Sequence, residues 1–380
     1  MFKRRFKKKR RFLNSLMILF CLILITVSSI QMVKPLQPLT NTSLFIHVPA
    51  LFGLPVLIFA ILSLIIGIGL IVLSYFDIDK NILKILKRAV LYSVLIVLSF
   101  YFVEYFILGS IRAFQIAKTY VYPDMPSEDQ FFVSTAWTLL TYKKDFGRGI
   151  IMTISISFIG TIVGLILGLL IAILRVQKVT NKDSEFKAFL KKIGLGFSKG
   201  YIAIFRGTPM MVQAILLYYL VPFAISQSMG ISMTIMDKIF TAFVTGLITV
   251  SLNTTAYLAE VLRGSIEGVD IGQSEAARSL GFGYWKTMFH IVLPQALKNS
   301  MPSIGNEFVI NIKDTSVLNV ITVADIFFAA NFIQGEIYRF NEPFFIAAII
   351  YLCLTFVTTR ILAFIDKKMD VQGKPLPSSN

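Results

Sequence analysis

The chain has 380 residues, of which 56% are hydrophobic and only 15% are charged, and its mean hydropathy is +0.74. Soluble globular domains carry roughly a quarter charged residues, so this composition excludes a soluble domain and indicates an integral membrane protein. The formal net charge is +16, but the basic residues are scattered between apolar segments, which favours a membrane surface over nucleic acid as the partner. The two cysteines, Cys21 and Cys353, lie in apolar runs and provide neither a disulfide framework nor a CxxC metal site.

Apolar runs long enough to cross a bilayer occur eight times along the chain. A helical crossing needs about 20 predominantly apolar residues. The predicted spans are Phe12–Val33, Val48–Phe76, Ala89–Gly109, Gly149–Leu174, Ala203–Ser226, Ile239–Val261, Met301–Asn331 and Pro343–Phe364. They predict an all-α membrane protein with about eight transmembrane helices.

Lysine and arginine concentrate in alternate connections, beginning with the basic segment Lys3–Arg11. Because basic residues accumulate on the cytoplasmic side of membrane proteins, this bias predicts that both termini are cytoplasmic. The basic segment and the first span also resemble a secretory signal peptide. The apolar part is too long for a signal, however, and no convincing small-residue cleavage site is present, so a retained membrane anchor is expected.

Residues 1–110 form an N-terminal extension with three predicted spans and one polar anomaly, Glu104, at membrane depth. An intramembrane acid is costly, so Glu104 is expected to face protein and not lipid. Residues 111–148 are expected outside the membrane, and this segment is too short to hold a substrate-binding domain. The remaining spans occupy residues 149–367, and a short tail, residues 368–380, follows them.

Two motifs in the first half of residues 149–367 concern helix packing. Gly160, Gly164 and Gly168 recur every four residues, which places them on one helix face and allows another backbone to approach closely. Further on, Thr208 and Pro209 have the composition of a helix start, with a threonine cap and proline at the first helical position. A helix is therefore expected to restart there.

The segment between the sixth and seventh spans, residues 262–300, contains a short predicted helix. Asp270 and Gln273 form a capping-box-like start, and Gly281 supplies a left-handed stop. Spacing of three and four residues places a small, apolar set on one face of this helix. That set is Gln273, Ala276, Ala277 and Leu280.

A second amphipathic helix is expected after Gly281. Its apolar side is predicted to carry Trp285, Met288, Phe289 and Val292, and Pro294 is expected to end it. On physical grounds alone, two interpretations of this helix pair remain open. It either rests on the inner leaflet of the membrane or docks into a groove of another protein.

Sequence motifs in this segment resemble a known family. The pattern Glu275-Ala276-Ala277, then Gly281, then Ile291-Val292-Leu293-Pro294 resembles the cytoplasmic EAA loop of ABC importer permeases. The surrounding AYLAEVLRGSIEGVDIGQSEAARSLG and LPQALKNSMPSIGNEFVINIKDTS, with the earlier FRGTPMMVQ, resemble the polar amino-acid importer branch. The resemblance covers about Gly149–Lys367 and implies a five-helix type I ABC importer permease core, preceded here by three extra helices.

The resemblance implies a prokaryotic cell-membrane protein that works in a dimer of permease subunits, homomeric or heteromeric. Each subunit would dock a coupling helix, Ile271–Leu280 in this chain, into a separate ATPase, and an external amino-acid-binding protein would deliver substrate. The residues implied in coupling are Gln273, Glu275, Ala276, Ala277, Leu280 and Gly281. No GxxxxGK[ST] loop is present in the sequence, so ATP and Mg²⁺ are expected on the partner ATPase, and this chain is expected to be neither an enzyme nor a cofactor-binding subunit. One departure is Asp270-Ile271, which stands where the family often has a proline.

Polar residues at membrane depth suggest a substrate path. The candidates are Gln213, Asn306, Glu307, Lys313 and Asp314. Residues seven apart lie close on a helix, which brings Asn306 beside Lys313 and Glu307 beside Asp314. Asp314, with the two residues after it, is also expected to cap a second half-helix that begins near Val317. An internal Lys313–Asp314 salt bridge is the alternative to substrate contact.

The sequence therefore predicts the transmembrane subunit of an ATP-driven amino-acid importer. A secondary amino-acid transporter is an alternative, for which an interrupted seventh span would be expected but the EAA segment would have no purpose. A third possibility is a non-transporting membrane scaffold, in which the intramembrane charges would be structural.

Overall fold

The computed structural model describes residues 109–180 and 183–368, together with isolated positions between residues 58 and 107. The first predicted span, most of the second and third spans, Glu104 and residues 369–380 lie outside the described residues. The predictions made for those parts of the chain therefore remain predictions.

The chain divides into two compact units, Met1–Thr141 and Tyr142–Asn380. In the described part of the first unit, helix α4 (Gly109–Ala117) packs against α5 (Phe131–Thr141). The second unit begins shortly before the predicted core at Gly149, and it contains the glycine repeat and the EAA-like segment.

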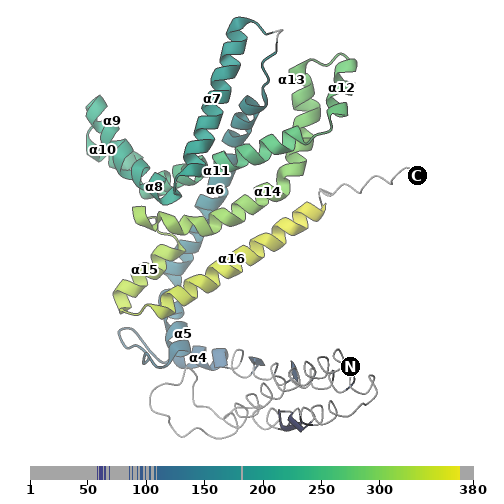
Figure 1. Cartoon of the computed structure of the whole chain (residues 1–380). Helices are drawn as coiled ribbons and strands as arrows, with labels where there is room; N and C mark the ends of the chain where they lie inside the picture. The colour runs from purple at the N-terminus through teal and green to yellow at the C-terminus, as the bar shows by residue number, and fades with distance from the viewer. Residues whose placement is uncertain are drawn as a thin grey trace, which may run out of the picture. The chain divides into compact units, whose positions relative to one another are not determined.

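The described residues of the second unit form helices and connecting turns without any strand, in agreement with the predicted all-α class. The helices are α6 (Lys143–Val176), α7 (Glu185–Gly207), α8 (Met210–Ile215), α9 (Val221–Met229), α10 (Met233–Ile239), α11 (Ala242–Glu267), α12 (Ile271–Ser279), α13 (Tyr284–Thr287), α14 (Leu293–Asp314), α15 (Ile326–Ile337) and α16 (Asn341–Lys368). Two π-helical turns, η2 (Leu216–Leu220) and η3 (Met288–Val292), and a 3₁₀ helix, η4 (Thr315–Ile321), connect some of them. In Figure 1, α12 and α13 lie at the same end of this unit as the start of α7, and the α15–α16 turn lies at the opposite end.

Four described helical stretches are long and apolar enough to cross a membrane, and a fifth crossing is possible if one bent pair counts as a single span. The four are Lys143–Val176, Met210–Met229, Ala242–Glu267 and Asn341–Lys368, and the bent pair is Tyr284–Ile321 with Ile326–Ile337. These stretches correspond to the five spans predicted for residues 149–367. The predicted total of eight transmembrane helices stays a prediction, because the first three spans include residues outside the described part.

The closest helix packing in the second unit is between α6 and α11. A Cβ atom added to Gly160 would come within 2.8 Å of the Val250 side chain, and one added to Gly164 would come within 2.6 Å of the Thr254 side chain. One added to Gly168 would lie 3.1 Å from the backbone nitrogen of Ala259. The glycine face of α6 therefore lets the two helices approach to a distance that a larger residue would prevent, as the four-residue repeat predicts.

Helix α7 was not predicted as a separate element, because its lysines placed most of it in a polar connection. It extends for 23 residues and ends at Gly207, where the chain turns and helix α8 begins at Met210. The predicted restart is therefore confirmed, but the capping assignment is wrong. Pro209 occupies the cap position, and the Thr208 hydroxyl donates back to the carbonyl of Ile204 at 2.8 Å. Threonine readily makes this i−4 hydrogen bond at the end of a helix.

The seventh predicted span is broken, but the break lies further along the chain than expected. Helix α14 continues through the 3₁₀ helix η4, whose tighter turns are accompanied by hydroxyl bonds from Thr315 to the carbonyl of Ile312 and from Ser316 to that of Lys313. The helical path ends at Thr322, which has a positive φ of 60°. The second half-helix begins at Ile326 and not near Val317, and the two halves are inclined at 48°.

The helix after Gly281 also differs from the expected one. Met288 and Val292 are buried, whereas Trp285 and Phe289 are exposed and stack on each other with their ring centroids 5.8 Å apart. The π-helical turn η3 accounts for this division, because it holds more residues per turn and rotates positions off the common face. Pro294 does not end the helix: it lies in the first turn of α14, where its missing N–H is tolerated.

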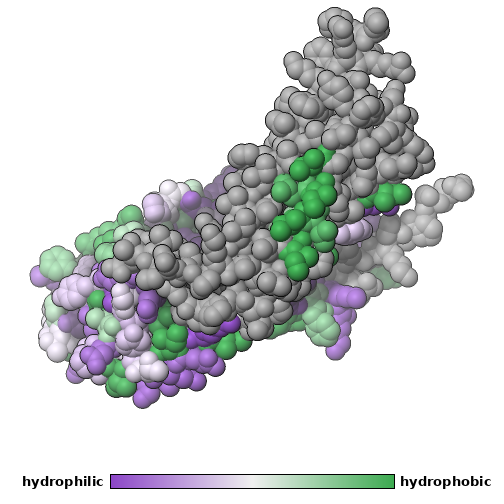
Figure 2. Space-filling model, turned by 90° about the horizontal axis from the view of Figure 1, so that it is seen from below, coloured by the Kyte–Doolittle hydropathy of each residue, from purple (hydrophilic) through white to green (hydrophobic). Residues whose placement is uncertain are grey.

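Large apolar side chains cover much of the outer surface of the spanning helices. On α6, Ile151 is 67% exposed, and on α16, Leu352 is 68% exposed. Figure 2 shows apolar residues lying at the surface among hydrophilic ones on the face seen from below. Such exposure is unfavourable in water, and it is what helices in contact with lipid or another membrane subunit require.

The α6–α11 contact leads to a first prediction. Gly164→Ala should destabilise the protein by about 1–3 kcal/mol, because the added methyl group overlaps Thr254 and forces the helices apart. The matched control is Gly147→Ala on the same helix, where a Cβ meets no atom within 4 Å. Thermal unfolding in detergent measures both. Equal melting temperatures for the two variants would show that the close approach does not limit stability.

Candidate functional site

Helix α12 is a short, well-capped element in the connection between α11 and α13. The Asp270 side chain accepts a hydrogen bond from the backbone nitrogen of Gly272 at 2.8 Å, which caps the start of the helix. At its end, Gly281 has a φ of 86°, and the backbone nitrogen of Phe282 donates to the carbonyl of Ala277 at 3.1 Å. Together with the bond from Gly281 to the carbonyl of Arg278 at 2.9 Å, this is a Schellman motif. Both predicted ends of the helix are confirmed.

The face that α12 exposes differs from the predicted one at a single important residue. Ala277 is only 5% exposed, because α12 packs against η3 and α13. The helix therefore uses Ala277 to attach to its own chain, and the prediction that this side chain lies on a free docking face is wrong. Leu280 is 80% exposed and Ile271 is 69% exposed. The other exposed coupling candidates are Gln273, Glu275, Ala276 and Gly281.

An apolar cluster connects the α12 loop to the spanning helices. Met288 and Val292 of η3 pack with Leu258 and Leu262 of α11 and with Ala172 of α6. These side chains are all buried. The loop that carries α12 is therefore attached to the ends of two membrane helices, so α12 is held in a fixed orientation relative to them.

An ion-pair network surrounds the same ends of α6 and α11. The Glu260 carboxylate pairs with Arg175 of α6 and, at 2.9 Å, with Arg263 one turn along its own helix. Arg263 also pairs with Glu267. Arg206 of α7 lies over the Tyr257 ring, 5.0 Å from its centroid. This network joins three helices with charged groups that the sequence analysis did not connect, because the partners are 85 residues apart in the chain.

The structure gives Gln213 a role in holding two helices together. Its Nε2 atom donates to the carbonyl oxygens of Phe205 and Thr208 at 2.9 and 3.0 Å and to the Thr208 hydroxyl at 2.8 Å. Its Oε1 atom accepts from Asn253 at 3.2 Å. Gln213 is buried, with its amide nitrogen bonded within the α7–α8 turn and its amide oxygen bonded to α11. A ligand could contact it only by displacing these bonds.

The other four substrate-path candidates lie along α14, in two pairs. Asn306 and Lys313 are exposed, whereas Glu307 and Asp314 are partly buried. Glu307 lies within electrostatic range of Asp314 and of Arg206. Within the described part of the chain, no hydrogen bond or ion pair engages the side chains of Glu307, Lys313 or Asp314, so the predicted alternative of a Lys313–Asp314 salt bridge is not formed.

Asn311, which was not predicted as a functional residue, lies on the same helix as these candidates. This residue is 4% exposed, and its Nδ2 atom donates to the hydroxyls of Thr161 on α6 and Thr254 on α11 at 2.9 and 3.0 Å. It fixes α14 against the closely packed pair of helices. An asparagine in an apolar span was the available signal, because a buried amide requires partners.

The start of the second half-helix is also fixed by a residue that was not predicted. Asp325 is fully buried, and its carboxylate accepts from the backbone nitrogen of Phe328 at 2.8 Å and from the hydroxyl of Tyr351 on α16 at 3.0 Å. Its carbonyl oxygen lies 2.8 Å from where a Cβ on Gly149 would be. The N–H groups at the start of α15 are therefore capped by the chain itself, so the helix start is not open to a ligand.

These features define the class of the molecule as an all-helical membrane protein with a broken span and a capped, exposed helix in the connection between two spans. Residues 186–371 match the family described as "Binding-protein-dependent transport system inner membrane component". The chain belongs to this family, which confirms the resemblance to ABC importer permeases.

Three relatives illustrate the match. The chain is 35% identical over 224 residues to a putative glutamine transport system permease protein GlnP of Rickettsia felis, covering 59% of this chain and 92% of that one. It is 32% identical over 222 residues to the arginine transport system permease protein ArtQ of Bacillus subtilis, covering 58% and 91%. A solved structure described as "Crystal structure of an amino acid ABC transporter with histidines" matches with a TM-score of 0.51 and 32% identity, covering 61% of this chain and 97% of that chain. Nearly the whole length of each of these proteins is matched, and about two fifths of this chain lies outside each match.

The position of Gln213 leads to a second prediction. Gln213→Ala should lower the stability of the protein by about 1–3 kcal/mol, because the Thr208 carbonyl loses its side-chain donor and the Phe205 carbonyl keeps only the one from Asn253. Gln295→Ala is the control, since Gln295 is exposed and its side chain bonds only to the carbonyl of Ile291 one turn earlier. Thermal unfolding should separate the two variants. Unchanged stability of Gln213→Ala, combined with weaker substrate binding, would return Gln213 to the substrate path.

Proposed function

We propose that this chain is the transmembrane subunit of an ATP-driven importer of polar or charged amino acids. ATP and Mg²⁺ bind to a separate ATPase, a second permease subunit completes the pathway, and an external binding protein delivers the substrate. The protein resides in a prokaryotic cell membrane with both termini in the cytoplasm, so that α12 faces the ATPase. Family membership and the substrates in the names of two relatives, glutamine and arginine, support this proposal.

The main support for a coupling role is the structure of α12. The helix is capped at both ends, attached to its own loop through Ala277, and it exposes Leu280 and Ile271 to solvent. Ile271 is the first residue of the helix and Leu280 is its C-cap, and a partner surface that covered either side chain would remove apolar area from water. A groove in an ATPase subunit is the partner that the family membership favours.

Substrate specificity is proposed to depend on the polar face of α14. Glu307 and Asp314 are partly buried carboxylates without an ion pair, and intramembrane charges of this kind usually face a cavity or a ligand. We propose that one of them faces the ammonium group of an amino acid and that Lys313 attracts its carboxylate. Asn306 lies one heptad before Lys313 and completes the polar face.

A secondary amino-acid transporter remains the alternative that a structural observation favours. The broken α14–α15 pair is a feature of such transporters. In that class, however, the exposed face of α12 would have no partner. Dependence of transport on an ATPase therefore separates the two functions.

Docking of α12 is tested with a charge on its exposed face. Leu280→Asp should weaken co-purification with the ATPase at least about tenfold, because the complex would bury an unpaired carboxylate. Tyr338→Asp is the control, since Tyr338 is 86% exposed at the opposite end of the unit, in a left-handed conformation that aspartate tolerates. Full ATPase association of the folded Leu280→Asp variant would contradict the docking role.

The substrate role of α14 is tested with nearly isosteric changes. Glu307→Gln and Asp314→Asn should each raise the apparent KM for transport roughly tenfold or more, if a charged hydrogen bond to substrate is lost, while the melting temperature stays the same. Glu336→Gln, an exposed change on α15, is the control. Loss of stability or assembly with an unaltered KM would show that the two carboxylates are structural.

A further inference from the structure

The C-terminal end of α6 contacts three different parts of the protein through four consecutive residues. Arg175 pairs with Glu260 of α11, and Val176 packs against the apolar cluster that contains Met288 and Val292. The Nε2 atom of Gln177 donates to the Tyr284 hydroxyl at 3.1 Å, and the carbonyl of Lys178 accepts from Lys191 of α7 at 2.9 Å. This end of α6 is therefore in direct contact with α11, with α13 and η3 of the segment that carries α12, and with α7.

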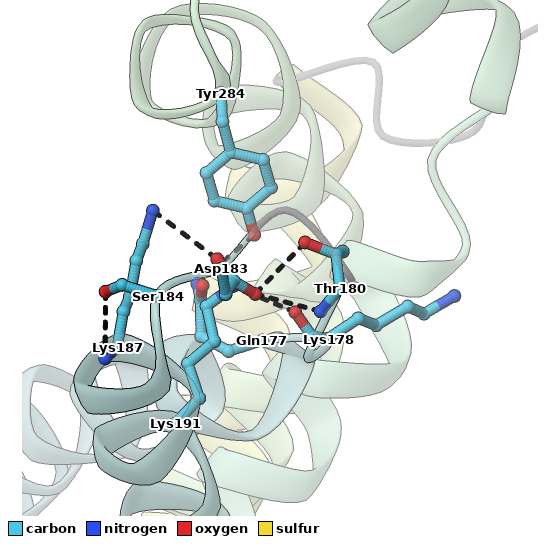
Figure 3. A network of polar contacts seen from close by, with 8 residues as sticks. All are labelled: Gln177, Lys178, Thr180, Asp183, Ser184, Lys187, Lys191 and Tyr284. Carbon is cyan, nitrogen blue, oxygen red and sulfur yellow. Dashed lines mark hydrogen bonds and ion pairs between the residues drawn. The ribbon is translucent and has the colours of Figure 1, made fainter.

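The connection from α6 to α7 is held in shape by Asp183, as Figure 3 shows. Its carboxylate accepts from the backbone nitrogen and the hydroxyl of Thr180 at 2.8 and 3.0 Å, and from Lys191 at 2.7 Å. Lys187 lies 3.5 Å from its other oxygen. The hydrogen bond from Lys191, followed by that from Thr180, holds the pKa of Asp183 well below its usual range. The carboxylate is therefore ionised, and its bonds intact, throughout the neutral pH range of a transport assay.

The Asp183 side chain is only 5% exposed and that of Lys191 17%, although they lie in a connection between helices. Lys191 of α7 donates both to Asp183 and to the carbonyl of Lys178, so it links the start of α7 to the residues that follow α6. These bonds join the described residues on both sides of the connection, so a displacement of the end of α6 acts directly on the start of α7.

The α12–α13 loop reaches this turn through Tyr284. In Figure 3 the Tyr284 hydroxyl points towards the turn from α13. The backbone of the loop leads only into α11 and α14, so α6 and α7 can follow the loop only through non-covalent contacts. The apolar contact of Val176 is non-directional and allows sliding, whereas the Gln177–Tyr284 hydrogen bond specifies one register.

We propose that the C-terminal end of α6 is a mechanical junction that receives the movement of the α12 loop through Tyr284 and passes it to α7. Gln177 and Tyr284 are the positioning residues that make the contact, and Asp183 and Lys191 make the turn rigid. This inference rests on the proposed function, since it requires that α12 is moved by an ATPase. It adds a second connection to the covalent one through α11 and α14.

The contact is tested in proteoliposomes that contain the full chain, its second permease subunit and its ATPase, with the binding protein added. The measured quantity is the number of substrate molecules transported per ATP hydrolysed. Tyr284→Phe and Gln177→Ala should each lower this ratio about threefold, the effect expected for one ordinary hydrogen bond. The double variant should have the same ratio of substrate transported to ATP hydrolysed as either single variant, because both changes remove the same hydrogen bond.

The rigidity of the turn is tested with two adjacent lysines. Lys191→Gln should lower the ratio at least as much as Tyr284→Phe, because Lys191 bonds to both Asp183 and the Lys178 carbonyl. Lys192→Gln is the matched control: Lys192 is exposed on the next position of α7, and no contact of its side chain joins it to the turn. It should leave the ratio unchanged. Melting temperature and ATPase association, measured on every variant, show whether folding and docking are kept.

The outcomes separate this inference from the function on which it rests. If the unmodified chain couples ATP hydrolysis to transport but Tyr284→Phe, Gln177→Ala and Lys191→Gln all keep the normal ratio, the junction is overturned and the proposed function stands. The same holds if the two single changes add in the double variant, because the residues would then act independently. If the unmodified chain does not associate with an ATPase, the proposed function and the junction both fail.

Discussion

The close approach of α6 and α11 is the contact on which the rest of the second unit depends. Gly160, Gly164 and Gly168 remove side chains from the seam, so that the backbones pack against each other. In a membrane there is little hydrophobic gain from bringing two apolar helices together, and association relies on dense packing and hydrogen bonds instead. Each of the other spanning helices described is placed directly or indirectly against this pair.

Polar groups then fix the positions of the surrounding helices. Asn311 holds α14 against the pair by bonding to a threonine of each helix, and Gln213 closes the turn between α7 and α8. Asp325 caps α15 and ties it to α16. Backbone and side-chain groups without water must find partners within the protein, so each break in a spanning helix is accompanied by a polar side chain that satisfies it. The only carboxylates of α14 left without such partners are Glu307 and Asp314, which is why they are proposed for substrate contact.

The sequence predicts those parts of the arrangement that depend on one residue spacing or on one helix cap. The glycine repeat predicts the α6–α11 seam, and Asp270 with Gly281 predicts the limits of α12. The errors arose where tertiary contacts decide. The lysines of α7 suggest an exposed connection, whereas in the structure Asp183 pairs with two of them. The burial of Ala277 depends on packing between helices, which residue spacing in the sequence does not show.

The position of the break in the seventh span shows the same limitation. Asp314 and the hydroxyl residues after it have the composition of a helix cap, but their hydroxyls bond back to the preceding turn and keep the chain helical. Asp325 has no stronger capping pattern in the local sequence. It becomes the cap because Tyr351 of a later helix donates to its carboxylate, while the hydroxyl of Thr153 on an earlier helix accepts from the next backbone nitrogen, that of Ile326. Local sequence therefore predicts that the span is interrupted, whereas distant residues decide where.

The central claim is that ATP hydrolysis in a partner drives transport through this subunit. The most direct measurement is uptake of a labelled amino acid into proteoliposomes that contain the chain with its ATPase and binding protein, with ATP inside and a proton uncoupler present. The account predicts uptake that requires ATP and persists with the uncoupler. Uptake that needs no ATP and is abolished by the uncoupler would contradict it and identify the chain as a secondary transporter.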